Sequence, residues 1–306
     1  MVQTFNIKYL SHHQIDKNKW DRCIKEAENG LIYGYSFYLD HMARHWDGLV
    51  LNDYEAIMPL AWNKKYGIQY LYQPFLCAQL GIFGKNIDAE ISKAFLKNVP
   101  SKFKYWDIYL NHQNIFNGKD FNILLRNNFI LNLTSSYDEL YKNYRENTQR
   151  NIKKAIQLGC VTQTNFPIEQ VIKLSIEHRK GHADQKQDFD QFEKLYHLLH
   201  EKKQAITYGA FSAFGELLSS SVFFFSNSRA YYILVGNHPN GRAVGASHAL
   251  IDSFIKDHAG QNRLLDFEGS DIRNLAFFYS GFGATEEKYP AIRLNNLPWY
   301  LKWLKK

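Results

Sequence analysis

The sequence predicts two α/β units in tandem, each built on a mixed sheet of the α+β type. Three observations lead to this prediction. The chain has 306 residues, which is enough for two domains of ordinary size. Hydrophobic residues make up 45% of it, so each unit can bury a core that offsets its ordering entropy. Helical and strand-like patterns follow one order in the second half, and the first half repeats a looser version of that order.

The first half opens with an extended stretch at residues 4–10. A helical pattern at residues 16–30 then stops at Gly30, a common residue at helix ends. Further helices are expected at residues 36–46 and 88–99. Strand-like runs lie at residues 48–53, 55–62, 68–75, 105–111 and 121–133.

The second half begins with one helical pattern at residues 135–159 that closes on Gly159. A strand at residues 160–166 precedes helices at residues 167–179 and 188–203. Three strands with short turns between them, an antiparallel meander, are predicted at residues 206–213, 217–226 and 229–237. A loop then leads into a helix that begins near Val244 and stops at Gly260. The stretch at residues 265–284 supplies one more strand and a short helix, and a last strand follows at residues 288–294. We therefore expect an N-terminal domain at residues 1–135, a helical connector at residues 136–159 and a C-terminal domain at residues 160–306.

The turn before the predicted helix at Val244 carries a candidate anion site. Glycines free the backbone there, and amides at a helix start favour a phosphate or pyrophosphate. The arrangement Arg242-x-x-Gly245-x-Ser247 resembles the loop with which the GNAT superfamily of acyltransferases holds the pyrophosphate of acyl-CoA. The resemblance implies that Arg242, Val244, Gly245 and Ser247 bind acyl-CoA, although Ser247 departs from the usual small apolar residue. The alternative is that the glycines only shape a strand-to-helix turn.

Three further segments resemble the FemABX group, whose members contain two tandem GNAT-like domains. They are LDFEGSDIRNLAFFYSGFGA at residues 265–284, the connector that runs from Arg150 to Gly159, and YQPFLCAQLGIF at residues 72–83. The resemblance implies two tandem GNAT-like domains and the transfer of an acyl or aminoacyl group to an amine. It also places Tyr72, Gln73 and Gln79 in a substrate-binding turn of the first domain.

Asp266 and Glu268 stand two residues apart at the end of a predicted strand, so alternation would put both carboxylates on one face. Glu268, beside a glycine, is the candidate catalytic base that accepts a proton from the amine. The alternative is a structural ion pair, which we favour for Asp266, with Arg263, Arg273 or Arg293 as the partner.

Tyr279 occupies an informative position in the segment Phe278-Tyr279-Ser280-Gly281-Phe282-Gly283. FemABX members that use aminoacyl-tRNA usually carry lysine there. A phenol can protonate a departing thiolate, the role that a tyrosine plays in many GNAT enzymes, so Tyr279 favours acyl-CoA as the donor. Its alternative role is that of one more aromatic side chain in a tyrosine-rich core.

Arg150 and Lys154 lie one turn apart on the predicted connector helix. They suit the phosphates of a nucleotide-linked acceptor or of RNA. A solvated basic face is the more usual explanation of such spacing.

Composition narrows the class of protein further. A net charge of +7 favours anionic partners without choosing among them. The three cysteines are far apart in sequence and have no metal-ligand spacing, so neither a disulfide framework nor a metal site is expected. The first ten residues do not resemble a signal peptide, and no apolar run is long enough to cross a bilayer, so a soluble cytoplasmic protein is expected.

These observations lead to one main functional hypothesis and two alternatives. The main hypothesis is a bacterial-type N-acyltransferase that moves an acyl group from acyl-CoA to an amine on a small molecule or cell-wall precursor. The first alternative keeps the fold but takes aminoacyl-tRNA as the donor and a peptidoglycan precursor as the acceptor. The second is a ligand-binding protein of the same fold without catalytic activity.

Overall fold

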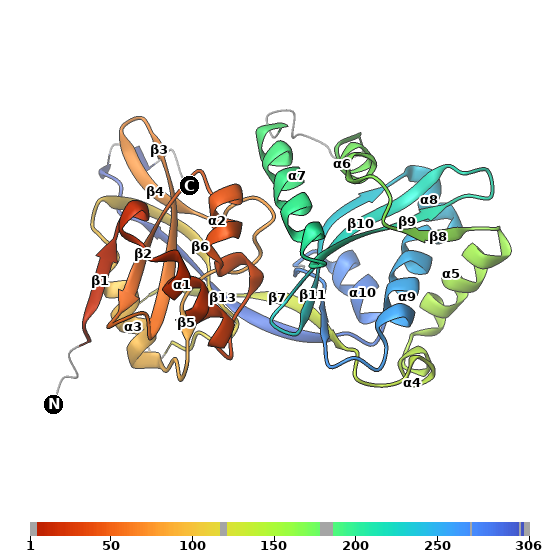
Figure 1. Ribbon diagram of the computed structural model, residues 1–306, viewed down its shortest axis with the longest axis horizontal. Coiled ribbons are helices and arrows are strands. Elements are labelled where there is room, and N and C mark those ends of the chain that lie inside the picture. Colours follow the sequence, from red (N-terminus) through yellow and green to blue (C-terminus); the bar gives the residue numbers. More distant parts are fainter. Residues whose placement is uncertain (1–4, 117–120, 178–185, 270, 300, 303–306) are drawn as a thin grey trace. The chain divides into compact units, whose positions relative to one another are not determined.

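The chain forms two compact α/β units in a computed structural model that describes residues 5–116, 121–177, 186–269, 271–299 and 301–302. Unit 1 comprises residues 1–126 and 288–306, and unit 2 comprises residues 127–287 (Figure 1). Each unit contains both parallel and antiparallel strand pairs, so the predicted mixed α/β class is confirmed. No helix in the described ranges is both long and apolar enough to span a membrane.

Unit 1 is a sheet with helices packed against it. Its strands follow the order β1-β2-β3-β4-β6-β13, and β5 pairs with β3. The strands that lie wholly in this unit are β1 (Ile7–Leu10), β2 (His45–Leu51), β3 (Ala56–Lys65), β4 (Ile68–Tyr72), β5 (Phe83–Gly84) and β6 (Phe103–Tyr109). The α-helices are α1 (Lys17–Glu26), α2 (Ser36–Met42) and α3 (Ala89–Lys97), and short 3₁₀ turns occupy His12–Gln14 and Ile32–Gly34.

Unit 2 has the strand order β7-β12-β11-β10-β9-β8. Its strands are β8 (Val161–Thr164), β9 (Ala205–Phe211), β10 (Leu217–Ser226), β11 (Arg229–Asn237), β12 (Leu264–Asp266) and the second part of β7 (Ile123–Asn132). Its helices are α4 (Tyr137–Lys142), α5 (Glu146–Gln157), α6 (Ile168–Glu177), α7 (Lys186–Glu201), α8 (Pro239–Val244), α9 (Ala246–His258) and α10 (Arg273–Ser280). The predicted end of the α6 helix at Arg179 lies outside the described residues.

The two units repeat one topology. In unit 1 the meander β2-β3-β4 is followed by α3 and then by β6, which pairs in parallel with β4. In unit 2 the meander β9-β10-β11 is followed by α8 and α9 and then by β12, which pairs in parallel with β11. A parallel neighbour requires a crossover connection, and the helix supplies it in both cases. The repeated element order predicted from the sequence is therefore present.

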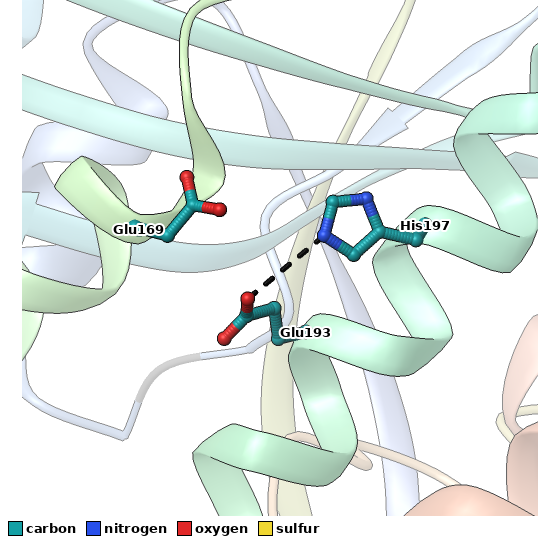
Figure 2. Close-up of side chains that lie close together, drawn as sticks. All are labelled: Glu169, Glu193 and His197. Atoms are coloured by element: carbon teal, nitrogen blue, oxygen red, sulfur yellow. Dashed lines mark ion pairs between the residues drawn. The ribbon is translucent and has the colours of Figure 1, made fainter.

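Helices cover both faces of the unit 2 sheet. Consecutive residues of β10 show this, because side chains alternate along a strand. Phe223 stacks on Phe254 of α9, with ring centroids 3.7 Å apart. The next residue, Phe224, stacks on Phe192 of α7 at 5.5 Å. Helices α6 and α7 therefore lie on one face and α9 on the other, and Figure 2 shows that Glu169 of α6 faces Glu193 and His197 of α7.

Short polar side chains set several helix starts. Asp16 precedes α1 and accepts hydrogen bonds from the backbone amides of Asn18 and Lys19. Ser136 and Glu139 form a reciprocal capping box at α4. This helix ends at Lys142, so the single helix predicted over residues 135–159 is wrong: α4 and α5 are separate helices. Between the two helices, the backbone amide of Arg145 donates a hydrogen bond to the Gly281 carbonyl. This partner is distant in the sequence, so the local helical pattern could not predict the break.

The observed boundaries differ from the predicted domains 1–135, 136–159 and 160–306. Helices α4 and α5, expected to be a connector, belong to unit 2. The last strand, β13 (Thr285–Asn295), begins in unit 2 and pairs with β6 of unit 1 from Ala291 to Asn295. The reason is physical: an alternating strand pattern specifies which side chains are buried, but not which neighbouring strand pairs with it.

Candidate functional site

Strands β11 and β12 part soon after they meet. They pair at only three positions, from Arg229 with Leu264 to Tyr231 with Asp266. β12 ends there, whereas β11 continues from Tyr232 to Asn237. Among the described residues no other strand pairs with that edge of β11. Backbone donors and acceptors along this stretch are thus able to bind an extended ligand. We call the Tyr231–Asp266 pair the divergence point.

Tyr279 lies at the divergence point on α10. Its ring stacks on Phe267, the residue after the last strand residue Asp266, with centroids 4.6 Å apart and planes 21° apart. It also meets Tyr232 of β11 edge to face at 6.5 Å. The residue is 7% exposed, so the ring is fixed by packing on both diverging strands. The prediction that Tyr279 belongs to an aromatic core is therefore compatible with a place at the candidate site.

The electrostatics keep the Tyr279 phenol protonated. Burial, and to a smaller extent the negative charge of Glu268, raise the pKa of this phenol above its ordinary value. A phenol that remains protonated at neutral pH can donate a hydrogen bond or a proton to a developing anion. Glu268 and Tyr279, the two predicted catalytic residues, are thus electrostatically coupled within unit 2.

Glu268 has a backbone conformation that non-glycine residues rarely adopt. Its φ is 66°, and Gly269 follows with a φ of 84°. The prediction that alternation places Asp266 and Glu268 on one face assumed extended backbone through Glu268, whereas the strand ends at Asp266 and Glu268 has a positive φ. The backbone amide of Glu268 donates to Asp266 Oδ1 at 2.9 Å. Such strained residues occur often at functional sites, which favours the assignment of Glu268.

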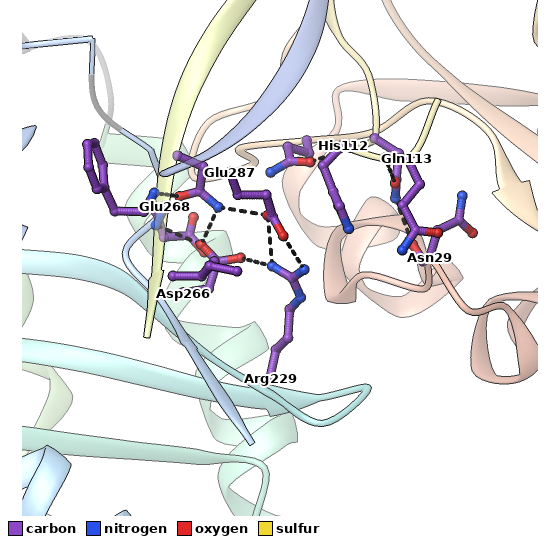
Figure 3. A network of polar contacts seen from close by, with 12 residues as sticks. Asn29, His112, Gln113, Arg229, Asp266, Glu268 and Glu287 are labelled. Carbon is purple, nitrogen blue, oxygen red and sulfur yellow. Dashed lines mark hydrogen bonds and ion pairs between the residues drawn. The ribbon is translucent and has the colours of Figure 1, made fainter. Parts of the chain in front are cut away.

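Asp266 is part of a buried ionic network that the sequence analysis missed (Figure 3). Arg229 donates to Asp266 Oδ2 at 2.8 Å and to Glu287 Oε1 at 2.8 Å. Asn128 donates to Asp266 Oδ1 at 2.9 Å and to Glu287 Oε2 at 3.2 Å. The expected structural ion pair exists, but its partner is Arg229, not Arg263, Arg273 or Arg293. The sequence did contain one indication of this network: an arginine is the first residue of the apolar strand RAYYILVG, and a buried guanidinium requires carboxylate partners.

The Arg242-to-Ser247 segment differs from the predicted loop. Arg242 and Val244 lie in the short helix α8, and Gly245, with a φ of 82°, joins α8 to α9. Arg242 is exposed. Ser247 Oγ donates to Asn237 Oδ1 at 2.7 Å, so this side chain links α9 to the end of β11. The start of the 13-residue helix α9 therefore lies beside the free stretch of β11.

Close packing also requires a glycine at position 245. A Cβ atom there would lie 2.5 Å from the Asn151 carbonyl oxygen of α5. Gly281, after α10, is restricted in the same way, since its Cβ would lie 2.4 Å from Thr148 Oγ1. Helix α5 thus packs closely on the start of α9 and the end of α10. Arg150 and Lys154 lie on its exposed face, and α5 also contacts α8, the helix of Arg242.

The three residues predicted to bind substrate in the first domain lie in unit 1 and support its fold. The Tyr72 phenol oxygen accepts a hydrogen bond from the Arg44 backbone amide at 2.7 Å. Gln73 Nε2 donates to the Cys77 carbonyl at 2.8 Å, and its Oε1 accepts from the Tyr109 amide at 3.0 Å. Gln79 is buried and accepts from the His112 amide at 2.9 Å. These contacts shape the turn between β4 and β5.

Comparison with solved structures shows the fold. The crystal structure of FemX aligns with a TM-score of 0.64 and 14% identity, over 97% of this chain and 99% of that chain. A tandem GNAT protein from the clavulanic acid biosynthesis pathway aligns with a TM-score of 0.55 and 12% identity, over 96% and 99%. The C-terminal domain of a putative lysylphosphatidylglycerol synthetase from Agrobacterium fabrum aligns with a TM-score of 0.51 and 8% identity, over 94% of each chain.

These alignments cover nearly the whole chain, and the predicted tandem GNAT-like fold of FemABX type is confirmed. No family model matches the sequence. No curated protein matches it at a significant level.

Proposed function

We propose that this chain, which has the FemX-like tandem GNAT fold, is an N-acyltransferase that moves an acyl group from acyl-CoA to an amine. The observation that carries the proposal is the divergence of β11 and β12 with Tyr279 packed at the point where they part. This arrangement provides an extended backbone edge for a thioester arm and a protonated phenol at one end of that edge.

The donor would lie along the free stretch of β11. The amide-linked arm of CoA can form hydrogen bonds with the backbone from Tyr232 to Asn237 in the manner of an added strand. Its pyrophosphate would lie near the start of α9, where helix amides favour anions, with Arg242 supplying a charge-assisted contact. In this proposal Val244 and Gly245 shape the turn, and Ser247 fixes the helix start through Asn237.

The chemistry then needs few groups. The amine nitrogen attacks the thioester carbonyl carbon, a C–N bond forms, and the C–S bond breaks. Glu268 accepts the proton that the amine nitrogen loses, and Tyr279 donates a proton to the departing thiolate. A proton returned from Glu268, directly or through water, restores the phenol. Most of the acceleration comes from holding the amine against the thioester, since this replaces a bimolecular encounter.

A second candidate donor is aminoacyl-tRNA. The similarity to FemX and the exposed pair Arg150 and Lys154 favour it, because a helix face with two cations suits RNA phosphates. Tyr279, in place of lysine, favours acyl-CoA. The acceptor in either case is an amine, on a small molecule or on a cell-wall precursor, and Tyr72, Gln73 and Gln79 are proposed to shape its site.

Calorimetry with acetyl-CoA and longer acyl-CoAs tests the proposed donor. Arg242→Glu should weaken binding by about 1 to 3 kcal/mol, the range of a charge-assisted hydrogen bond. The matched control is Arg22→Glu, because Arg22 is also exposed but lies in unit 1. This variant should bind acyl-CoA as the wild type does. Equal affinity of wild type and Arg242→Glu would show that the turn has only a structural role.

A further inference from the structure

Helices α6 and α7 bring three ligating side chains together on the sheet face opposite to α9. Glu169 lies in the first turn of α6, and Glu193 and His197 lie one turn apart on α7. Their ligand atoms all lie within 4.8 Å of one another, and His197 Nε2 is 3.9 Å from Glu193 Oε1 (Figure 2). None of the three takes part in the acyl-transfer site proposed above.

Basic side chains of the described residues do not balance the charges in this group. In the described parts of the chain, neither Glu169 nor Glu193 has a lysine or arginine within ion-pair distance. Two carboxylates from different helices therefore approach each other, and among the described residues only an imidazole is close to both. With His197 neutral, the group carries a charge of about −2, which one divalent cation would neutralise.

We propose that Glu169, Glu193 and His197 bind a divalent transition metal of the Zn²⁺ type that bridges α6 and α7. One imidazole nitrogen and two carboxylate oxygens, each about 2.0 to 2.2 Å from the ion, are ligand types that zinc accepts, and they would leave a fourth position for water. The i, i+4 spacing of Glu193 and His197 directs both side chains to one side of α7. Imidazole favours zinc over magnesium or calcium, which prefer oxygen ligands alone.

The location indicates that the metal would link two helices. Helix α6 packs directly on β11, since a Cβ atom at Gly236 would lie 2.8 Å from the Ser175 backbone nitrogen. Tyr279 and α9 lie on the other face of the same strand. A metal that joins α6 to α7 would fix the helix layer behind β11, and it would not contact the acyl donor.

Metal titration of the full-length, tag-free protein tests the proposal. After treatment with EDTA and its removal, ZnCl₂ is titrated by calorimetry, and melting temperatures are measured with and without Zn²⁺. Wild type should bind one Zn²⁺ per chain and melt at a higher temperature with it. His197→Ala and Glu169→Gln should each weaken binding on the order of 10- to 100-fold, at least the effect of losing an outer-shell partner.

His200→Ala is the matched control. His200 lies on the same helix but stacks on Tyr196, with ring centroids 5.4 Å apart, and does not belong to the group. It should bind Zn²⁺ as the wild type does. Three results would overturn the proposal: no Zn²⁺ binding by wild type, binding by His197→Ala with wild-type affinity, or equal losses in His197→Ala and His200→Ala. Zn²⁺ held by one of the free cysteines would give the second result. The readout is independent of the proposed acyltransferase activity.

Discussion

Replacing Arg229 by methionine should destabilise unit 2 strongly. The Arg229 side chain is 8% exposed and pairs with Asp266 and Glu287, whose side chains are 3% and 13% exposed. Burial by itself would lower the pKa of Arg229, but the two carboxylates outweigh this effect and raise it, so the guanidinium stays charged. Methionine fills similar volume but removes the guanidinium that both carboxylates bind.

The magnitude follows from what each carboxylate retains. Asp266 would keep hydrogen bonds from Asn128 and from the Glu268 amide, and Glu287 would keep the bond of 3.2 Å from Asn128. Breaking a buried ion pair on one side costs about 3 to 5 kcal/mol. Glu287 is partly exposed and can regain water, so we expect the lower end, about 3 kcal/mol.

The control is Arg293→Met. Arg293 also pairs with an aspartate, Asp107, at 3.2 Å, but the two side chains are 59% and 36% exposed. An exposed pair is worth about 0 to 1 kcal/mol. The difference in stability loss between Arg229→Met and Arg293→Met therefore reports how burial changes the contribution of an arginine–carboxylate interaction.

Hydrogen exchange followed by mass spectrometry is the appropriate assay, because all six tryptophans lie outside residues 127–287 and their fluorescence cannot report on unit 2. Amides in peptides covering β11 and β12 should exchange roughly 100-fold faster in Arg229→Met than in wild type, the equivalent of about 3 kcal/mol. Arg293→Met should leave them unchanged. Exchange in Arg229→Met within about threefold of wild type would refute the reasoning.

Two further predictions concern pH and backbone geometry. Burial lowers the pKa of His248 from 6.5 to about 4, so below pH 6.5 the unfolded chain binds a proton that the folded chain does not. Stability should fall as the pH is lowered from about 7.5 to 5, and His248→Gln should remove up to about 2 kcal/mol of that loss in urea unfolding; an equal loss in both proteins would contradict this. Gly245 and Gly215 both have a φ of 82°, but a Cβ atom would lie 2.5 Å from a carbonyl oxygen only at Gly245 and would meet nothing within 4 Å at Gly215. Gly245→Ala should therefore lower the free energy of unfolding more than Gly215→Ala, for which we expect a loss of about 1 kcal/mol from backbone strain alone. Equal melting temperatures of the two variants would show that α5 moves to accommodate the new side chain.

The sequence predicted the repeated order of elements because each element is encoded locally. The meander β9-β10-β11 appears as three apolar runs with turns between them, and α1 appears as a periodic pattern that begins after Asp16. Domain boundaries depend on long-range pairing. Residues 130–132 of β7 pair with β12, and residues 291–295 of β13 pair with β6. Each of these strands therefore pairs with a strand far from it in the sequence, which the local pattern does not specify.

The candidate site also combines features that the local sequence predicts with features that depend on long-range contacts. The segment around Tyr279 was recognised by its resemblance to a known family, and the structure places it at the divergence point. The network around Arg229 was missed because its partners are 37 and 58 positions away in the chain. The placement of Glu268 by alternation assumed extended backbone, and this residue has a positive φ.

The group of Glu169, Glu193 and His197, which we propose as a zinc site, is not visible in the sequence for a related reason. The spacing of the three cysteines gave no reason to expect a metal site. Glu193 and His197 show helical spacing, but the third side chain, Glu169, comes from another helix. Only the packing of α6 against α7 brings these residues together.

Turnover by Tyr279→Phe tests the central claim most directly. The variant keeps the ring that stacks on Phe267 and removes only the hydroxyl. With acyl-CoA and a panel of primary amines, release of the CoA thiol should be about 100-fold slower than in wild type, while CoA affinity and melting temperature stay nearly unchanged. Wild-type turnover in Tyr279→Phe would contradict the role of the phenol. A wild-type protein that consumes charged tRNA and ignores every acyl-CoA would contradict the donor that we propose.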